Sequence, residues 1–318
     1  MVIFGFESYG GPSAARFIEV DEPAPQPGHV LIEVEATAVN PGDIKVRSGQ
    51  RQGAFPVAFP MAMGREAAGR VVAAPDGAFP PGTRVFGAAA AGFGTFAPRA
   101  LLAAESVAEV PEGVSSAAAA CVPVAVGTAY DALADLHLQR GQTLLVLGAG
   151  GGVGTAALQL AHSAGAHTVG VASESKRDVV EAAGAVFVRS GPGWPQRALA
   201  AAGIPDAVLD LVGGEALTAG AALGSDTRPA GAGDAIPFAQ ALRDMRLISA
   251  ADPERAAQLG GSGIRRRRSA EVYAKLAALL ASGALEVSIG RRFHFSQADR
   301  AVAAVEGGHA AGKVVVYM

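Results

Sequence analysis

A short apolar run that leads straight into a glycine-rich turn decides the fold of this chain. Residues 144–154 read LLVLGAGGGVG, and the run begins at Thr143. An unbroken apolar run is typical of a strand buried on both faces, and residues 152–164 can follow as a helix. A glycine turn lets the backbone approach a diphosphate, and a helix N-terminus offers free N–H groups. The order strand, turn and helix therefore predicts a dinucleotide-binding site.

The abundance of glycine leaves an alternative open for this turn. The chain contains 42 glycines, and the turn reads Ala149-x-Gly151-x-x-Gly154, with alanine where the usual pattern has its first glycine. A glycine-rich linker would explain residues 231–233 equally well. Only over residues 144–164 do an expected strand, turn and helix coincide, which favours the dinucleotide interpretation. The residues that we assign to this cofactor site are Ala149, Gly150, Gly151, Gly152, Val153 and Gly154.

The end of the next expected strand, residues 167–172, indicates which dinucleotide binds. NAD binding calls for an acidic residue at this strand tip, about 20 positions on, to meet the ribose 2′-hydroxyl. Ala172 and Ser173 occupy the tip, and Glu174 comes too late. The hydroxyl of Ser173 and the ammonium of Lys176 suit a 2′-phosphate instead, although Lys176 can also be a solvated helix lysine. The sequence therefore predicts NADPH over NADH.

The second half of the chain alternates short apolar runs with helical patterns. Alternation of this kind implies right-handed crossovers and a parallel sheet. The expected strands are 143–147, 167–172, 185–189, 206–211 and 246–249, and the expected helices are 152–164 and 175–183.

The first part of the chain, by contrast, reads as short strands between glycines and prolines. Residues 30–36 alternate apolar and charged side chains, with Val30, Ile32 and Val34 on one face. This pattern predicts a half-buried strand in a folded-over β barrel or sandwich. Further strands are expected at 69–73, 83–86 and 313–317, and a helix at 269–281 with Ser269 as N-cap and Val272, Leu276 and Leu279 or Leu280 on one face.

Composition excludes several classes of protein. Of 318 residues, 50% are hydrophobic and 17% charged, which suits about two domains with large cores. The net charge of −3 gives no electrostatic reason to expect nucleic acid. The single cysteine, Cys121, excludes an intrachain disulfide and is expected to be buried. Residues 113–130 are uncharged but rich in alanine, so we expect no membrane partner and a cytoplasmic location.

Further motifs make the chain resemble a known family. They are AVNPGD (38–43), GREAAG (64–69), TAY (128–130), DLVGG (210–214) and GKVV (312–315). In this order and spacing the chain resembles the zinc-independent quinone oxidoreductases, the zeta-crystallin-like group of the medium-chain dehydrogenase/reductase superfamily. The resemblance extends over nearly the whole chain.

The resemblance implies an α/β fold of two domains. Residues 1–121 and 263–318 would form a GroES-like β domain that binds substrate. Residues 122–262 would form an inserted Rossmann domain with a doubly wound parallel sheet, and the active site would lie in the cleft between the domains. The resemblance alone also implies a homodimer.

Departures from the zinc-dependent relatives bear on the chemistry. Those relatives carry a cysteine where Asn40 stands and a histidine where Arg65 stands. With one cysteine and no His/Cys pair at ligand spacing, no catalytic metal is expected. Oxidation of an alcohol needs a Lewis acid to stabilise the alkoxide. We therefore expect hydride transfer to an activated π-system, a quinone or an α,β-unsaturated carbonyl compound.

Three residues are candidates for catalysis, each with a structural alternative. The resemblance places the amide of Asn40 near the nicotinamide or the substrate carbonyl, although Asn-Pro-Gly is also a turn sequence. Asp43 would lie close by, or pair with Arg47 or Arg65. Arg65 would clamp an anionic substrate, or pair with Asp43 and Glu66.

The resemblance adds four residues to the cofactor site. Thr128 opens a helix and would contact the nicotinamide end. Asp210 and Val212 lie in the turn after the fourth strand, at the carboxyl edge where open α/β sheets bind ligands. Lys313 belongs to the terminal motif.

Two segments remain outside this scheme. Residues 265–268 are four arginines, for which neutralisation by acids such as Asp252, Glu254 and Glu271 is favoured over an anion or nucleic-acid patch. Residues 225–235 read as a loop that can reshape one wall of the cleft.

The sequence supports three functions, with a small molecule as the partner in the first two. The first is an NADPH-dependent, metal-free reductase of quinones or α,β-unsaturated carbonyl compounds. The second is an enoyl-thioester reductase of a biosynthetic pathway. The third is an NADPH-binding protein without turnover.

Overall fold

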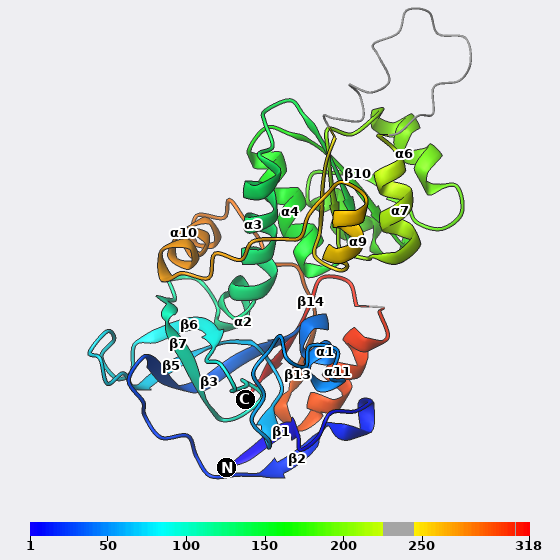
Figure 1. The fold of residues 1–318 in the computed structure, drawn as a ribbon. Coiled ribbons are helices and arrows are strands. Elements are labelled where there is room, and N and C mark those ends of the chain that lie inside the picture. Colours follow the sequence, from blue (N-terminus) through cyan, green and yellow to red (C-terminus); the bar gives the residue numbers. More distant parts are fainter. Residues whose placement is uncertain (225–244, 309) are drawn as a thin grey trace, which may run out of the picture. The chain divides into compact units, whose positions relative to one another are not determined.

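The computed structural model describes residues 1–224, 245–308 and 310–318 (Figure 1). These residues form two compact units. The first contains Met1–Gly127 and Arg267–Met318, and the second contains Thr128–Arg266. The loop expected at 225–235 lies outside the described residues.

Four strands of the first unit close into a barrel. They are β3 (His29–Val39), β5 (Glu66–Ala73), β6 (Arg84–Ala89) and β7 (Arg99–Glu109). β3 pairs with β5 on one side and with β7 on the other, and β6 joins β5 to β7. Val30, Ile32 and Val34 lie together in the barrel core, which confirms the predicted half-buried strand.

Two strands from the far end of the chain extend this sheet. β14 (Lys313–Tyr317) runs antiparallel to β3, with Val314 opposite Val39, and β13 (Ile289–His294) runs parallel to β14. The chain therefore returns to its first unit after it has formed the second, and it closes the sheet edge that β3 would otherwise expose.

A three-stranded sheet in the order β2-β1-β4 and several helices complete the first unit. Side chains of β1, β4, α11 and β14 meet in a second core, which is rich in phenylalanine, methionine and valine. These elements are β1 (Val2–Phe6), β2 (Arg16–Glu19), β4 (Met61–Ala62), α1 (Pro41–Arg47), α2 (Ser116–Ala119), α10 (Ala270–Ala281), α11 (Ala298–Glu306), and the short 3₁₀ turns η1 (Pro12–Ala14) and η4 (Phe295–Gln297).

Helix α10 begins where the sequence predicts. The Ser269 hydroxyl accepts the N–H of Val272 at 3.3 Å, which confirms the N-cap. The buried face differs from the expected one, because it centres on Tyr273, Leu276 and Ala277 while Val272 is only half-buried. The Tyr273 ring packs 6.2 Å from that of Phe86 in the barrel, which sets this rotation.

The second unit contains a five-stranded parallel sheet in the order β10-β9-β8-β11-β12. The strands are β8 (Thr143–Leu147), β9 (His167–Ala172), β10 (Val186–Arg189), β11 (Ala207–Asp210) and β12 (Arg246–Ser249). Each lies within one residue of its predicted range. The parallel α/β fold class is thereby confirmed.

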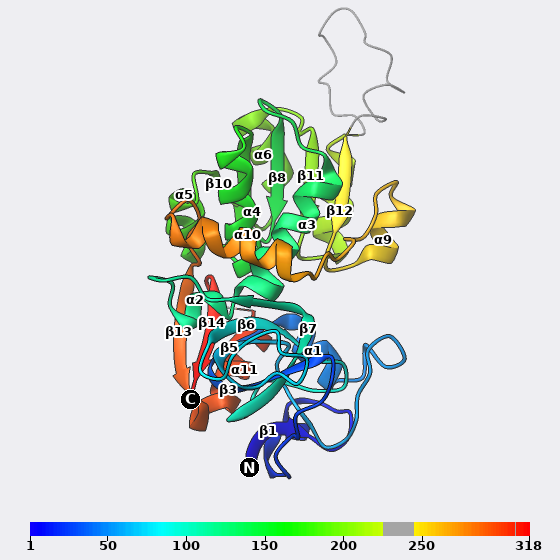
Figure 2. The ribbon, with the colours of Figure 1, turned by 90° about the vertical axis from the view of Figure 1, so that its left-hand side faces the viewer.

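Helices cover both faces of this sheet, as a doubly wound fold requires. Figure 1 shows α4 on one side and α6 and α7 on the other, and Figure 2 shows the sheet turned by 90°. The helical segments are α3 (Gly127–Leu136), α4 (Gly152–Ser163), η3 (Glu174–Lys176), α5 (Arg177–Ala182), α6 (Trp194–Ala202), α7 (Gly214–Ala222) and α9 (Pro253–Gln258).

One helical stretch of the described chain, Ser116–Leu136, is long and apolar enough to cross a membrane by length and composition alone. Of its most apolar window, 67% is buried inside the structure, as in the core helix of a folded protein, so it is weak evidence for a span. The stretch is not a regular helix. Pro123 lacks an N–H, and a π-helical turn, η2 (Val122–Val126), surrounds it.

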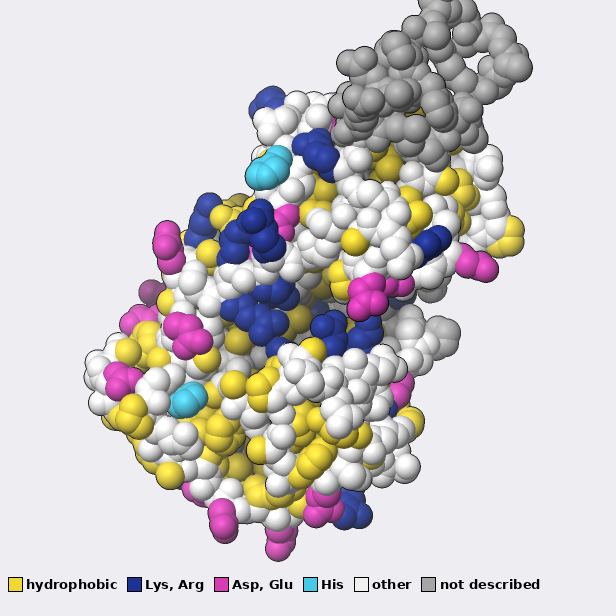
Figure 3. Space-filling model, viewed as in Figure 1, with side chains coloured by type: hydrophobic (Ala, Val, Ile, Leu, Met, Phe, Trp, Pro, Cys, Tyr) yellow, Lys and Arg dark blue, Asp and Glu magenta, His cyan; other side chains and the backbone are white. Residues whose placement is uncertain are grey.

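Hydrophobic side chains are scattered over much of the first-unit face seen in Figure 3. Phe17 and Phe59 are two exposed aromatic rings of this unit. Phe17 packs edge-on against Phe4 at 5.2 Å, and Phe59 against Tyr9 at 5.1 Å. These rings are therefore the outer layer of the aromatic core beneath them.

Candidate active site

The residues of the glycine turn between β8 and α4 have different structural roles. The left-handed backbone, with φ +82°, lies at Gly148. Ala149 therefore need not be glycine, and its methyl group packs against Gly170. A Cβ at Gly154 would lie 2.5 Å from the carbonyl oxygen of Ala149, so glycine is required there for close approach of helix and turn.

Helix α4 presents its first turn at this point. Gly151 is the N-cap, in extended conformation, and the helix runs for 12 residues. The first N–H groups of any helix lack partners within it, so those of Gly152, Val153 and Gly154 face outward. A Cβ at Gly151 would meet only the Gly148 carbonyl oxygen, at 3.6 Å. The turn thus has the geometry of an anion-binding site in which backbone N–H groups are the donors.

Lys176 lies against the same turn. A Cβ at Gly150 would be 2.6 Å from both Cβ and Cδ of Lys176, so the lysine stem crosses directly over Gly150. Partial burial lowers the pKa of Lys176. The Ser173 and Ser175 hydroxyls lie 3.2 Å apart beside it. The structure therefore brings Lys176 to the predicted cofactor turn.

The nearest carboxylate at this strand tip is engaged elsewhere. Glu174 accepts from Nε of Arg177 at 2.7 Å, and this bond lowers the pKa of Glu174. The carboxylate is directed to a helix arginine and is not at the last position of β9. This arrangement agrees with the absence of the ribose-binding acid that NAD sites use.

Asp210 shapes the turn after β11 and is fully buried. Its Oδ1 accepts the N–H groups of Val212 and Gly213, both at 3.0 Å, and its Oδ2 accepts the Ser249 hydroxyl at 2.6 Å. The carboxylate thus holds the turn in place, while the Val212 side chain is 56% exposed. Of the two predicted residues, Val212 is the one available to a ligand.

The first two arginines of the run 265–268 pair with helix α3. Arg266 donates to Asp131 at 3.0 Å and to the Thr128 hydroxyl at 2.5 Å, and Arg265 pairs with Asp135 at 3.3 Å. Neutralisation by acids is confirmed for these two, but their partners are Asp131 and Asp135 and not the expected Asp252, Glu254 or Glu271. The true partners lie about 130 residues away in sequence. The Thr128 hydroxyl is therefore positioned by the guanidinium of Arg266.

In the first unit, Asn40 lies at the end of β3 and begins helix α1 as its N-cap. Its backbone N–H donates to Oδ2 of Asp43 at 2.8 Å, so the predicted turn role is present. Its side chain has three further bonds. Nδ2 donates to Oε1 of Glu66 at 2.8 Å and to the Ala38 carbonyl at 3.2 Å, and Oδ1 accepts from Nζ of Lys313 at 2.5 Å.

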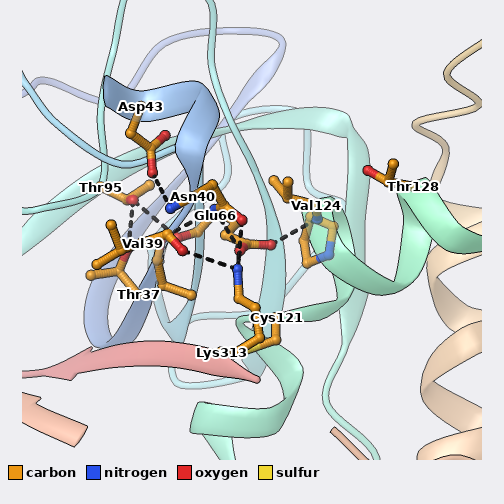
Figure 4. A network of polar contacts seen from close by, with 12 residues as sticks. Thr37, Val39, Asn40, Asp43, Glu66, Thr95, Cys121, Val124, Thr128 and Lys313 are labelled. Atoms are coloured by element: carbon orange, nitrogen blue, oxygen red, sulfur yellow. Dashed lines mark hydrogen bonds and ion pairs between the residues drawn. The ribbon is translucent and has the colours of Figure 1, made fainter. Parts of the chain in front are cut away.

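Glu66 and Lys313 form a buried ion pair beside Asn40, and Figure 4 shows the three side chains converging. Nζ of Lys313 donates to Oε1 of Glu66 at 2.9 Å and to the Val39 carbonyl at 3.3 Å. Oε2 of Glu66 accepts the backbone N–H of Val124 at 2.7 Å. Burial is the largest single effect on Lys313 and would lower its pKa, but the hydrogen-bonded Glu66 carboxylate together with Cys121 and Asp43 outweighs burial, and the pKa is raised.

Glu66 is the site residue that sequence reasoning missed. The GREAAG motif contains it, but the sequence suggests it only as a partner of Arg65. The cofactor role of Lys313 stays a prediction. The structure places it in the polar network of Asn40 and Glu66, which we call the Asn40 network.

Asp43 is a buried carboxyl group beside this network. Oδ2 accepts from Asn40, while Oδ1 has no hydrogen-bond partner among the described residues. Burial raises the pKa of Asp43 to about 7, although the Asn40 N–H and the charge of Arg65 act in the opposite direction. The alternative pairing with Arg47 is wrong, because Arg47 pairs with Glu306 at 2.6 Å. The Arg65 guanidinium stacks on the Phe55 ring at 3.9 Å.

The donor set of the described residues does not fit a metal ion. Nowhere in the described ranges do three His, Cys, Asp or Glu side chains come together as a possible metal site. Cys121 is buried, as predicted, and burial raises the pKa of its thiol to about 12.

Family models match both parts of the chain. Residues 26–112 match the alcohol dehydrogenase GroES-like domain, and residues 195–316 match a model described as zinc-binding dehydrogenase. A mycobacterial structure complexed with NADPH superposes with a TM-score of 0.82 at 27% identity and 100% coverage of both chains.

Curated relatives fall into reductases and large synthases. The chain is 43% identical over 174 residues to erythronolide synthase EryA2 of Saccharopolyspora erythraea, which covers 51% of this chain but 5% of that protein. It is 33% identical over 191 residues to acryloyl-coenzyme A reductase of Metallosphaera sedula, covering 51% and 56%. It is 34% identical over 190 residues to a chloroplast envelope quinone oxidoreductase homolog of Arabidopsis thaliana, covering 57% and 58%.

These matches, together with the fold, are those of NAD(P)-binding oxidoreductases of the medium-chain dehydrogenase/reductase superfamily. Within that superfamily the chain is similar to the zinc-independent quinone oxidoreductase type. It spans only a small part of the large synthases and just over half of the two smaller relatives.

Proposed function

We propose that this chain is an NADPH-dependent reductase that delivers hydride to a quinone or an α,β-unsaturated carbonyl compound without a metal. The observation that carries the proposal is the glycine turn at 149–154 with Lys176 lying across it. Main-chain N–H groups of Gly152 to Gly154 would bind the diphosphate, and bound NADPH supplies the hydride.

The cofactor preference rests on charge at the strand tip. Ser173 and Lys176 can donate to a 2′-phosphate, and Glu174 is held by Arg177. No carboxylate therefore stands at the tip position that would select the 2′-hydroxyl of NADH. The mycobacterial relative complexed with NADPH supports the same preference.

The acceptor side rests on the Asn40 network and its neighbours. Asp43 can hold a proton near neutral pH, because burial raises its pKa to about 7. Arg65 carries a positive charge that can attract the oxygen on which negative charge develops when a conjugated carbonyl is reduced. Asn40, Asp43 and Arg65 stay our proposed catalytic residues.

The decisive experiment follows NADPH absorbance with a panel of free quinones, enones and enoyl thioesters. We expect turnover with at least one quinone or enone, and a lower kcat/KM for Asn40→Ala on the best acceptor. Binding of NADPH without oxidation by any acceptor would instead support a non-catalytic nucleotide-binding protein.

A second candidate is an enoyl-thioester reductase. It is favoured by the likeness to acryloyl-coenzyme A reductase and by the 43% identity to part of a synthase. A preference for enoyl thioesters over free quinones of at least tenfold in kcat/KM would select it.

The remaining expectations concern the setting of the protein. A homodimer and a cytoplasmic location stay proposals drawn from the resemblance. Analytical ultracentrifugation of the purified chain tests the first, because a monomer at micromolar concentration contradicts it.

A further inference from the structure

The orientation of the Asn40 amide is fixed by the chemistry of its two neighbours. Lys313 only donates and the Glu66 carboxylate only accepts. The oxygen of the amide must therefore face Lys313, and the nitrogen must face Glu66, as Figure 4 shows. A flipped amide would place N–H against ammonium and oxygen against carboxylate.

In this orientation both N–H donors of the Asn40 amide already have acceptors. The NH₂ group has two N–H donors, and these go to Glu66 and to the Ala38 carbonyl. The carbonyl oxygen has two lone pairs, of which Lys313 takes one; the N–H of Asp43 in the capping box donates to the Asn40 backbone carbonyl at 3.0 Å and not to this oxygen. Asn40 can therefore accept one more hydrogen bond but can donate none.

The two neighbours are themselves held in place. All three N–H groups of Lys313 have acceptors, namely Asn40, Glu66 and the Val39 carbonyl. Glu66 is anchored at its second oxygen by the N–H of Val124, within the π-helical turn around Pro123. The network has little freedom to turn the amide round.

We propose that Lys313 and Glu66 are positioning residues that make Asn40 an acceptor-only group. The ligand group that meets it is then a neutral N–H donor such as the carboxamide of the nicotinamide, and not the carbonyl of the acceptor substrate. This inference rests on the proposed function. The sequence leaves two partners open for Asn40, the nicotinamide and the substrate carbonyl, and the inference selects the nicotinamide.

Equilibrium binding tests this inference without turnover. The ligands are NADP⁺ and its 3-acetylpyridine analogue, in which a methyl group replaces the carboxamide NH₂. We expect the wild-type chain to bind NADP⁺ about tenfold more tightly, because the analogue leaves a buried acceptor without a donor. In Asn40→Ala this preference should fall to about unity.

Two further variants separate positioning from folding. Glu66→Gln combined with Lys313→Met removes both buried charges together, so that neither is left unpaired. We expect it to lose most of the preference while its melting temperature shows a folded chain. Lys275→Met, on the exposed side of α10, is the matched control and should keep the full preference.

An isosteric change gives a further test. In Asn40→Asp the oxygen next to Lys313 still accepts a hydrogen bond, whether the new carboxyl group is protonated or ionised. The preference for NADP⁺ should therefore persist at both low and high pH. Loss of the preference in this variant, when it is folded, contradicts the assignment.

The outcomes distinguish the inference from the proposed function. If the wild-type chain binds neither nucleotide, the proposed function is wrong and the inference fails with it. If it binds both equally, or if Asn40→Ala and the double variant keep the preference, the inference alone is wrong.

Discussion

The carboxyl group of Asp43 is buried, and its burial makes the stability of the folded chain depend on pH. Its pKa is about 7 in the folded chain, against 3.8 for an ordinary, solvent-exposed aspartate. Between these values the unfolded chain releases its proton first, so the native state becomes less stable as the pH rises. The shift corresponds to roughly 4 kcal/mol over that window.

We predict that Asp43→Asn removes this dependence. The free energy of unfolding of the variant, relative to wild type, should rise by about 2–4 kcal/mol between pH 4 and pH 8. Urea denaturation at the two pH values measures it. Parallel pH profiles for the two proteins would show that Asp43 is ionised when folded.

Lys176 gives a second prediction at the scale of one residue. Lys176→Ala should weaken NADPH binding by about 10- to 100-fold, because a hydrogen bond to a charged group is lost, and should change NADH binding little. Fluorescence titration with both nucleotides measures the two dissociation constants. Lys275→Ala serves as the control, and an equal loss for both nucleotides would place Lys176 away from the 2′-phosphate.

At the scale of the element, the turn between β8 and α4 contains glycines that are needed for two different reasons. Gly154 allows close packing of the backbone, and Gly151 leaves space for the cofactor. Gly154→Ala places a Cβ 2.5 Å from the Ala149 carbonyl, so α4 must move and the chain should lose about 1–3 kcal/mol of stability. Gly151→Ala meets nothing closer than 3.6 Å and should keep wild-type stability. Its methyl group should still weaken NADPH binding, because it occupies the path of the diphosphate.

Thermal melting and NADPH titration of both variants check this prediction. Thermal melting reports the packing requirement at Gly154, and NADPH titration reports the space that the cofactor needs at Gly151. A destabilised Gly151→Ala, or a Gly154→Ala chain that melts like wild type, would reverse the roles that we assign.

The elements that sequence predicts well are those with a local cause. The run at 143–147 is continuous and apolar because both faces of β8 are covered, so its bounds could be predicted to the residue. The π-helical turn at 122–126 could not, because the N–H of Val124 is satisfied by Glu66, 58 residues away in sequence. The barrel closure between β3 and β7 is equally non-local.

On the scale of the whole molecule, one ion pair joins distant parts of the first unit. Arg47 of α1 meets Glu306 of α11 at 2.6 Å; the arginine side chain is 2% exposed and the glutamate 29%. We predict that Glu306→Ala costs about 3 kcal/mol and Arg47→Met less, because removing the glutamate leaves a buried charge unpaired. Hydrogen exchange of the first-unit amides measures both losses, and the reverse order contradicts this account.

The candidate site shows the same limit of prediction at this larger scale. The glycine turn is one continuous segment, so its residues could be assigned from sequence. The Asn40 network joins residues up to 273 positions apart, and only a resemblance could suggest that Asn40 matters. Nothing local in the sequence shows that the amide of Asn40 faces a lysine.

The return of β14 to β3 has a consequence for biosynthesis. A ribosome completes the second unit before it reaches residue 313, so a nascent chain can fold its nucleotide-binding half while Glu66 still lacks a counter-ion. Until that lysine emerges, the glutamate has to stay solvated or protonated, which disfavours early closure of the barrel around it. The order of translation thus delays the buried Glu66–Lys313 pair, and with it the fixed orientation of the Asn40 amide, until β14 has been synthesised.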